Sequence, residues 1–509
     1  MSAAVEYSVT PGLGYCAVVP DFLTPRECRE LIALAENKGF RSPSADYPPT
    51  YRNNDRLVHD DESLAKHLFE RLHAVAPPSM PAPDDVGPGS WRLDSVNERL
   101  RFCRYTADQQ FRIHQDGVHH RAFNRRSMLT FIVYLSDGED FVGGDTEFFA
   151  DGPRATPDGS DQPEVVVRVR PKMGTLILFE HRIWHAGAKI VSGTKYILRS
   201  DVLYRNDEAS SLETSGHRGY IWTLSRQGPD SFVSGGRDCS IRVWNRAFEP
   251  TAVLTGHTHS VLGLAPLDVS CLASVSRDRT LRIWNVSTSS CTNTVVAHDA
   301  AALTVVRLDG ERIATGGADR VIRIWSHAGS EIAGIQAHDG WVWKLVRVND
   351  RLFASASEDG AVKLWQTKTH VNAGCLPGTA PLRSMAASPD GKRLVTGDVL
   401  GRLRVWVDLE TNPQIESEWI AHRAAVRSVV FLGPNTIASG GEDNRMHVWS
   451  GGPRRLLYRA EHKNFVTDII AVDGQSCAST SYGGEICVHR YLDPLRDEFA
   501  ATRSFQNCM

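Results

Sequence analysis

The sequence predicts a mainly β protein built from two parts of different design. At 509 residues the chain is longer than one hydrophobic core usually serves, so two or more domains are expected. From about residue 210 onward, short alternating segments that end in tryptophan recur at a nearly constant interval. The residues before that point show no such repeat. We therefore expect a first domain over residues 1–205 and a second over residues 206–509.

The first domain opens with a well-marked helix in the segment TPRECRELIALAENKG. Thr24 can cap this helix, Pro25 suits its first position, and Glu27 completes a capping box. Gly39 is a good terminator. A second helix is expected over residues 61–75, where it stops before a pair of prolines.

The pattern then changes from helices to strands. After a proline-rich stretch come the segments RLRFCRY, RSMLTFIVYL, VVVRVR, GTLILF and KYILRSDVLY. Helices followed by short strands with glycine-rich turns predict a sheet structure that is buttressed by the N-terminal helices.

The stretch FRIHQDGVHH, residues 111–120, holds three histidines and one aspartate. On a strand, residues i and i+2 face the same side, so His114 and Asp116 would present an imidazole and a carboxylate to one point. A further histidine would complete the two-histidine, one-carboxylate set of non-heme iron, which leaves positions open for oxygen. His119 and His120 follow a glycine, and we expect them to face solvent or substrate rather than the metal.

Residues from about 97 to 205 resemble the catalytic domain of the prolyl 4-hydroxylase-like iron(II)/2-oxoglutarate dioxygenases. The resemblance rests on the His-x-Asp pair, on NERLR before it and on GTLILFEHRIWHAGAKIVSGTKYILRSDVLYR after it. It implies a double-stranded β-helix, or jelly roll, with Fe(2+) and 2-oxoglutarate as cofactor and cosubstrate. It also implies that His114, Asp116 and His185 hold the iron.

The resemblance assigns the remaining site residues as well. His185 lies ten residues before Lys195, the spacing of the family's distal ligand, whereas the rival His181 lies fourteen before it. Lys195 then binds the far carboxylate of 2-oxoglutarate, which must be paired if buried. Arg199 faces the same side of the strand and is a second candidate for that carboxylate, or it holds substrate or a neighbouring strand. Tyr105 matches a tyrosine near the cosubstrate, or it packs as an ordinary strand residue.

The implied reaction hydroxylates a C–H bond while 2-oxoglutarate is decarboxylated to succinate, and L-ascorbate can keep the iron reduced. A family resemblance indicates the reaction class and not the target. Three interpretations stay open. The chain is a protein hydroxylase, prolyl by resemblance, or it is an oxygenase of a small molecule whose second domain docks the enzyme onto a complex. Alternatively, it is a non-catalytic scaffold in which both domains only bind.

The second domain repeats with a period near 40 residues. Histidines recur at 217, 257, 298, 338, 422 and 462, and tryptophans close most units at 244, 284, 325, 365, 406 and 449. A unit that fills the double gap has Gly378 in the place of the histidine, and a seventh unit ends with His489 in the place of the tryptophan. The whole region resembles the WD-repeat family, whose units are four-stranded blades that close into a propeller. The resemblance therefore implies a seven-bladed β-propeller.

The repeated histidines and aspartates are expected to tie loops together rather than to bind metal. The family's aspartate, six residues before the tryptophan, is Asp238, Asp278, Asp319, Asp359 and Asp443; Leu400 and Gly483 replace it in units five and seven. The last blade needs an outer strand, which either residues 209–215 or the tail after 492 can supply. We favour 209–215, because TAVLT takes that place before His257.

We expect the propeller to recruit a protein partner. On the face that carries the tight turns, exposed aromatic residues mixed with charges of both signs would suit a protein surface. The residues expected there are Tyr220, Trp341 and Phe465, with Arg237, Arg277, Glu358 and Glu442.

Composition limits the other classes of partner. The net charge of −3 shows no positive excess that would favour nucleic acid. The start, MSAAVEYSVT, does not resemble a signal peptide, and the apolar run MLTFIVYL is far shorter than the roughly 18 residues of a membrane helix. The ten cysteines lack the short paired spacings of zinc sites or disulfide scaffolds. We expect an intracellular, cytoplasmic protein with reduced thiols and no membrane or nucleic-acid partner.

Overall fold

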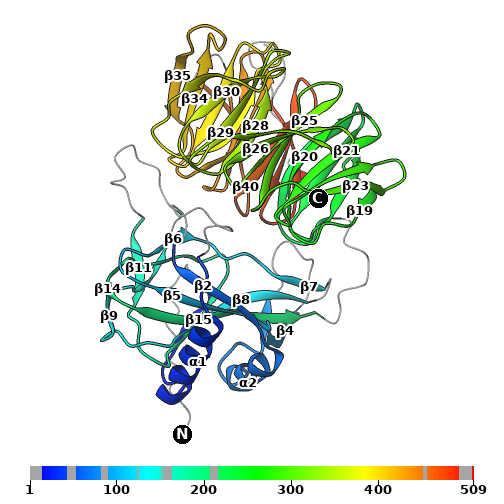
Figure 1. Cartoon of the computed structure of the whole chain (residues 1–509). Coiled ribbons are helices and arrows are strands. Elements are labelled where there is room, and N and C mark those ends of the chain that lie inside the picture. Colours follow the sequence, from blue (N-terminus) through cyan, green and yellow to red (C-terminus); the bar gives the residue numbers. More distant parts are fainter. Residues whose placement is uncertain are drawn as a thin grey trace. The chain divides into compact units, whose positions relative to one another are not determined.

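The computed structural model describes residues 14–42, 53–81, 90–122, 125–150, 152, 163–206, 216–450, 455–491 and 507–508. These residues form two compact units, residues 14–206 and residues 216–508, shown as ribbons in Figure 1. No described helix is long and apolar enough to cross a membrane.

The first unit contains the helices α1 (Pro25–Lys38) and α2 (Glu62–Leu72). The predicted capping box is present, because the Glu27 backbone N–H donates to the Thr24 hydroxyl and the Glu27 carboxylate accepts from the Thr24 backbone N–H. Gly39 ends α1 with a positive φ of 85°. The second helix is shorter than predicted: it ends at Leu72, and the chain turns before residue 75.

The strands of this unit form one large sheet and two smaller ones. The nine-stranded sheet contains β1 (Cys16–Val19), β2 (Asp55–Asp60), β3 (Ser79–Pro81), β4 (Ser90–Val96), β5 (Arg99–Tyr105), β7 (His120–Ala122), β8 (Arg125–Tyr134), β12 (Leu176–Glu180) and β15 (Lys195–Arg205). The four-stranded sheet has the order β11 (Val165–Val169), β10 (Thr146–Phe149), β13 (Trp184–Gly187), β6 (Phe111–His114). The two-stranded sheet pairs β9 (Phe141–Gly143) with β14 (Ile190–Gly193).

Strand β8 shows how the two faces of the large sheet are used. Leu129, Phe131 and Val133 belong to one core cluster, which also contains the buried residues of α1 and α2. Ile132 and Tyr134 point to the opposite face and into a second cluster, which includes residues of the four-stranded sheet. This alternation follows from the two-residue period of a strand. The helices therefore buttress one face, and the small sheet covers the other in the predicted jelly roll.

The second unit consists of seven antiparallel sheets of four strands each. The first four blades are β16 (Ile221–Gly228), β17 (Ser231–Gly236), β18 (Ile241–Asn245), β19 (Pro250–Leu254); β20 (Val261–Pro266), β21 (Cys271–Ser276), β22 (Thr280–Asn285), β23 (Ser290–Val296); β24 (Ala302–Arg307), β25 (Arg312–Gly317), β26 (Val321–Ser326), β27 (Glu331–Gln336); β28 (Val342–Arg347), β29 (Leu352–Ser357), β30 (Val362–Gln366), β31 (Asn372–Leu376). The last three are β32 (Leu382–Ala387), β33 (Leu394–Asp398), β34 (Arg402–Val407), β35 (Gln414–Ile420); β36 (Val426–Gly433), β37 (Thr436–Gly441), β38 (Arg445–Ser450), β39 (Arg455–Glu461); β40 (Val466–Ala471), β41 (Ser476–Ser481), β42 (Ile486–Arg490), β43 (Asn507–Cys508).

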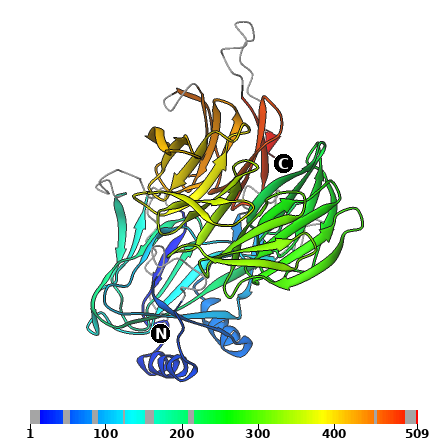
Figure 2. The ribbon, with the colours of Figure 1, turned by 45° about the horizontal axis from the view of Figure 1, so that its top comes forward.

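The seven sheets close into a ring, and Figure 2 shows the blades, coloured from green to red along the chain, from a second direction. The innermost strand of each blade contacts that of the next, and β40 of the last blade contacts β16 of the first. The outermost strand of blade seven is β43, from the C-terminal tail, so the predicted use of residues 209–215 for this place is wrong. The tail follows β42 in sequence, and consecutive strands usually pair. Residues 209–215 themselves lie outside the described residues.

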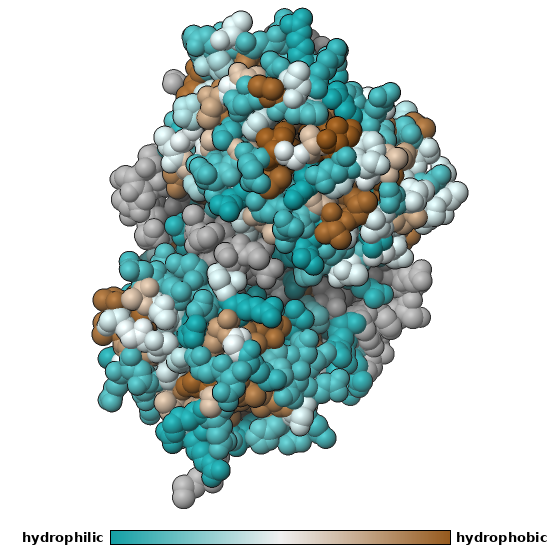
Figure 3. Space-filling view, in the orientation of Figure 1, coloured by the Kyte–Doolittle hydropathy of each residue, from teal (hydrophilic) through white to brown (hydrophobic). Residues whose placement is uncertain are grey.

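Exposed apolar side chains of the propeller are scattered rather than gathered. Several belong to the outermost strands of different blades, among them Val253, Val296, Ile332, Ile415 and Leu456. The view in Figure 3 shows small hydrophobic patches separated by hydrophilic residues. Isolated apolar residues of this kind are normal on protein surfaces and do not by themselves indicate an interface.

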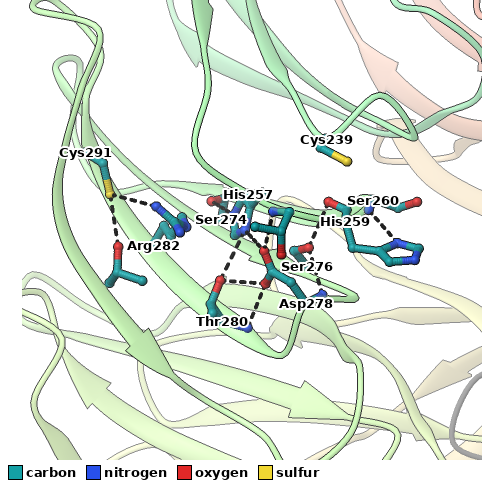
Figure 4. Close-up of polar contacts among 12 residues, drawn as sticks. Cys239, His257, His259, Ser260, Ser274, Ser276, Asp278, Thr280, Arg282 and Cys291 are labelled. Carbon is teal, nitrogen blue, oxygen red and sulfur yellow. Dashed lines mark hydrogen bonds and ion pairs between the residues drawn. The ribbon is translucent and has the colours of Figure 1, made fainter. Parts of the chain in front are cut away.

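The repeated histidines and aspartates form the predicted structural network. In blade two, shown in Figure 4, His257 Nδ1 lies 2.8 Å from an oxygen of Asp278 and His257 Nε2 lies 2.7 Å from the hydroxyl of Ser274. The Trp284 indole N–H donates to the same hydroxyl at 2.8 Å. The histidine–aspartate contact recurs in four other blades, as His217–Asp238, His298–Asp319, His338–Asp359 and His422–Asp443. Five of the seven blades therefore share this buried polar network.

The predicted exposure of aromatic residues on the turn face is wrong. Tyr220, Trp341 and Phe465 are 9%, 6% and 4% exposed. Tyr220 stacks on Tyr482 with ring centroids 4.2 Å apart, and Phe465 packs against the same ring at 4.9 Å. The aromatic rings of blades one and seven thus cover one another, which removes the apolar surface that the prediction relied on.

Candidate metal centre

Two histidines from neighbouring strands and one aspartate from the following loop converge in the first unit. His114 ends β6 and His185 lies on β13, and the register of these strands places the two residues directly opposite each other. Asp116 follows two residues after the end of β6. One ligand atom from each residue lies within 4.8 Å of the others, and all three residues are buried. The structure therefore brings together the predicted His114, Asp116 and His185.

Backbone carbonyls orient both imidazoles. His114 Nδ1 lies 2.7 Å from the Arg112 carbonyl oxygen, and His185 Nδ1 lies 2.9 Å from that of Ile183. A carbonyl only accepts hydrogen bonds, so each Nδ1 carries the hydrogen and each neutral ring has its lone pair on Nε2. The Nε2 atoms lie 3.4 Å and 3.6 Å from the two oxygens of Asp116. The three donor groups thus face one small space.

The charges of the three groups suit a divalent metal. Burial lowers the pKa of His114, and it lowers the pKa of His185 to about 3, so both rings are neutral. Burial alone would raise the pKa of the Asp116 carboxyl, but the positive charge of Arg199, the largest opposing cause, holds that pKa well below its usual range. Metal binding requires unprotonated ligands. Two neutral imidazoles and one carboxylate are the donor set that non-heme iron(II) uses, so the residues present fit iron.

His181, the rival for the distal position, is used elsewhere. Its Nδ1 lies 2.9 Å from the Thr130 hydroxyl and its Nε2 lies 2.8 Å from the Ser127 hydroxyl. Both ring nitrogens therefore have hydrogen-bond partners within the core. Burial lowers the pKa of His181 to about 4, so this ring too is neutral at physiological pH.

Lys195 lies at the start of β15, opposite Tyr105 of β5. Its side chain is 4% exposed, and its ammonium group donates to the carbonyl oxygen of Gly144. The ammonium nitrogen lies 5.7 Å from the ring centre of Tyr105 and 5.1 Å from that of Tyr134. Burial lowers the pKa of Lys195 to about 8. A buried cation therefore lies close to two aromatic rings.

Gly144 belongs to the GGDTEFF stretch, and its backbone lies close to the side chains of Ile190 and Lys195. Its φ is 75°, and a Cβ atom at this position would lie 2.4 Å from Ile190 and 3.2 Å from the Lys195 side chain. Only glycine fits this conformation and this spacing. The glycine therefore allows the backbone to come close to the Lys195 side chain.

Arg199 lies against the metal centre rather than beside Lys195. Its guanidinium donates to Oδ1 of Asp116, and its side chain is 13% exposed. The sequence did not predict this contact with the ligand carboxylate.

Sequence reasoning also missed Thr130 and Tyr134. Thr130 donates to Oδ2 of Asp116 at 2.6 Å, and the Tyr134 ring lies against Lys195. Both lie on β8, where they read as ordinary strand residues. The one available signal was a threonine among apolar residues in MLTFIVYL.

The two histidines after the motif lie outside the cluster of ligand atoms. The His119 backbone N–H donates to the Ser127 hydroxyl at 2.7 Å, and its side chain is half-buried. His120 is the first residue of β7.

Two family models match the chain. The model of the 2OG-Fe(II) oxygenase superfamily matches residues 100–200. The model of the WD domain, G-beta repeat, matches residues 209–245, 248–285, 289–326, 329–366, 371–407 and 414–450. The seventh blade, which has Gly483 in place of the aspartate and His489 in place of the tryptophan, is outside these six matches.

Several WD-repeat proteins and their relatives match a little under half of the chain. The DENN domain and WD repeat-containing protein SCD1 of Arabidopsis thaliana is 27% identical over 270 residues, which are 44% of this chain and 23% of that protein. Nuclear distribution protein PAC1 of Arthroderma benhamiae is 25% identical over 264 residues, 46% of this chain and 50% of that protein. Human echinoderm microtubule-associated protein-like 2 is 27% identical over 264 residues, 49% of this chain and 40% of that protein. The chain thus matches half or less of the length of each.

Proposed function

We propose that this chain, in which a 2OG-Fe(II) oxygenase domain precedes a WD-repeat propeller, is an iron(II)- and 2-oxoglutarate-dependent dioxygenase that hydroxylates a protein side chain. The convergence of His114, Asp116 and His185 carries the proposal. A two-histidine, one-carboxylate set leaves coordination positions for a cosubstrate and for oxygen. The choice of proline as the target residue rests on the family resemblance alone.

Side chains of the first unit would bind the metal and keep its carboxylate ligand ionised. His114 and His185 bind through Nε2, because their Nδ1 atoms donate to backbone carbonyls. Asp116 binds as a carboxylate, and Arg199 keeps it ionised in the buried site. When bound, iron(II) and 2-oxoglutarate would activate dioxygen for the oxidation, and 2-oxoglutarate would be decarboxylated to succinate.

Lys195 is proposed to bind the far carboxylate of 2-oxoglutarate. A buried carboxylate needs a paired and hydrogen-bonded partner, and Lys195 offers a buried cation whose ammonium group donates to the Gly144 carbonyl oxygen. The rings of Tyr105 and Tyr134 flank the ammonium group and limit access of water. Arg199 is occupied by Asp116, which favours Lys195 over Arg199 for this role.

The propeller is proposed to recruit the protein that is hydroxylated, or a partner that carries it. WD repeats generally serve protein interaction, and the similarity to other WD-repeat proteins supports this use. The scattered apolar residues of Figure 3 favour no particular patch. Ascorbate dependence and an intracellular location stay predictions.

The proposal is tested by substrate capture with the full chain. The parent and a His185→Ala variant are each incubated with a cell extract, iron(II), 2-oxoglutarate and air, with and without ascorbate. Bound proteins are then analysed by mass spectrometry. A captured protein that gains one oxygen atom with the parent, and none with the variant, would support a protein hydroxylase. Succinate release without any modified protein would favour a small-molecule substrate. A folded parent that releases no succinate would overturn the proposal that the chain is an enzyme.

A further inference from the structure

A chain of four hydrogen bonds leads through the core of the oxygenase unit to the ligand carboxylate. The His119 backbone N–H donates to Ser127 Oγ at 2.7 Å, and this hydroxyl lies 2.8 Å from His181 Nε2. His181 Nδ1 lies 2.9 Å from Thr130 Oγ1, which lies 2.6 Å from Oδ2 of Asp116. Ser127 and Thr130 are fully buried, and His181 and Asp116 are 5% and 6% exposed. No step of the chain runs through solvent-exposed side chains.

The hydrogens available to these groups fix which atom donates and which accepts in each of the four hydrogen bonds. An ionised carboxylate can only accept, so the single hydroxyl hydrogen of Thr130 points at Asp116. Thr130 Oγ1 must then accept from His181, which places the ring hydrogen on Nδ1. The remaining nitrogen, Nε2, carries a lone pair and accepts from the Ser127 hydroxyl. Ser127 in turn accepts from the backbone N–H of His119. Each hydrogen in the chain is donated once, and one tautomer of His181 is selected.

Three hydrogen bonds restrain Asp116. The carboxylate accepts from Thr130 at Oδ2 and from Arg199 at Oδ1, so rotation would break a contact at each oxygen. The Asp116 backbone N–H donates to the His181 carbonyl oxygen at 2.9 Å. Asp116 has no strand of its own to hold it, because β6 ends at His114. These contacts supply the rigidity that the backbone lacks there.

We propose that His181 is a positioning residue of the metal centre, which fixes the rotation of the Asp116 carboxylate through the hydroxyl of Thr130. The inference rests on the proposed function, because it concerns how a ligand is held for the metal. Outer partners that orient metal ligands typically change metal affinity by about 10- to 100-fold when removed. His181 thus has a role in the centre without being a ligand.

Paired variants at each position separate this role from simple packing. Thr130→Val removes the hydroxyl at nearly constant shape, whereas Thr130→Ser retains it. In His181→Asn an amide can reach the place of Nδ1 and still donate to Thr130. In His181→Gln the amide reaches the place of Nε2 and meets Ser127 instead. Ser200→Ala is the control for loss of a buried hydroxyl, because Ser200 donates to the Asn97 carbonyl oxygen at 2.7 Å and contacts no ligand.

The probe is Co(2+) alone, titrated into the full-length protein and followed by its visible d–d absorption, with unfolding of the metal-free proteins as the check on folding. We expect Thr130→Val and His181→Gln to bind Co(2+) about 10- to 100-fold more weakly and with altered spectra. Thr130→Ser, His181→Asn and Ser200→Ala should resemble the parent in affinity and spectrum.

Two results would overturn the inference alone, and two others would also overturn the proposed metal site. Parent-like Co(2+) binding by folded Thr130→Val would show that the hydroxyl does not position Asp116. Equal losses in His181→Asn and His181→Gln would remove the role assigned to Nδ1. Failure of the parent to bind Co(2+), or binding that survives Asp116→Ala, would instead overturn the proposed metal site itself, and the inference with it.

Discussion

The guanidinium of Arg199 donates to Oδ1 of Asp116 inside the oxygenase unit, where the two side chains are 13% and 3% exposed. Arg199 lies on β15 and Asp116 on the loop after β6, so the contact joins the large and small sheets. A carboxylate in such surroundings stays ionised only if a positive charge lies close to it. In the absence of metal, Arg199 is that charge.

Removing this cation should destabilise the protein in a way that metal reverses. Breaking a buried ion pair usually costs about 3–5 kcal/mol, because the remaining charge is left uncompensated. We expect Arg199→Met to lower the free energy of unfolding by about that amount without metal, and Co(2+) to restore more stability in this variant than in the parent. Chemical unfolding with and without Co(2+) measures both quantities.

The matched control for this experiment is Arg168→Met. Arg168 pairs with Glu147, but its side chain is 57% exposed. Exposed pairs contribute about 1 kcal/mol or less, so this variant should behave as the parent does. An Arg199→Met protein as stable as Arg168→Met, with no extra response to Co(2+), would contradict the role of Arg199.

Lys195 should reduce the stability of the protein while no cosubstrate is bound. Burial lowers its pKa from 10.5 to about 8, which corresponds to about 3 kcal/mol against the charged form. At pH 7 the folded state holds this cation. We therefore expect Lys195→Met to be more stable than the parent at pH 7 and to lose binding of 2-oxoglutarate. Thermal unfolding with and without 2-oxoglutarate tests this, and a destabilised variant that still responds to 2-oxoglutarate would be inconsistent with it.

The same pKa predicts how binding of 2-oxoglutarate varies with pH. Lys195 is charged below about pH 8 and neutral above it, so affinity for the dianion should fall as the pH rises through that value. An arginine stays charged throughout this range. The dissociation constant of 2-oxoglutarate with Co(2+) present should therefore rise above pH 8 in the parent and stay level in Lys195→Arg. Identical pH profiles would exclude Lys195 as the titrating group.

In the propeller, a single hydroxyl should matter more than its size suggests. Ser274 is fully buried and serves both His257 Nε2 and the Trp284 indole N–H. Its loss leaves buried polar atoms unsatisfied, at a cost of about 1–3 kcal/mol. We expect Ser274→Ala to lower the unfolding midpoint of the propeller measurably. The exposed Ser290 of the same blade is the control, and Ser290→Ala should have no such effect. Equal effects of the two variants would argue against the network as a source of stability.

Much of the fold could be predicted because its signals are local or repeated. The capping box of Thr24 and Glu27 and the alternation of β8 each depend on a few neighbouring residues. The His–Asp–Trp spacing spans more of the chain but recurs from unit to unit, which makes it recognisable. The pairing of His114 with His185 was predictable only through a family spacing, since their contact depends on the register of β6 and β13.

The failures involve contacts between segments far apart in the sequence. β43 was not predicted because two residues carry no periodicity. Tyr220 was expected to be exposed, but its neighbour Tyr482 comes from the last blade, 262 positions further along the chain. Thr130 and His181 meet through the pairing of β8 with β12, which no short pattern reveals.

The central claim is that His114, Asp116 and His185 form an iron site that binds 2-oxoglutarate. It is tested most directly by adding iron(II) and 2-oxoglutarate to the protein without oxygen and recording the visible charge-transfer absorption of the chelate. We expect the band in the parent and in His67→Ala, which alters a histidine that is 53% exposed on α2, and no band in His185→Ala. A well-folded parent without the band, or a band that persists in His185→Ala, would contradict the account.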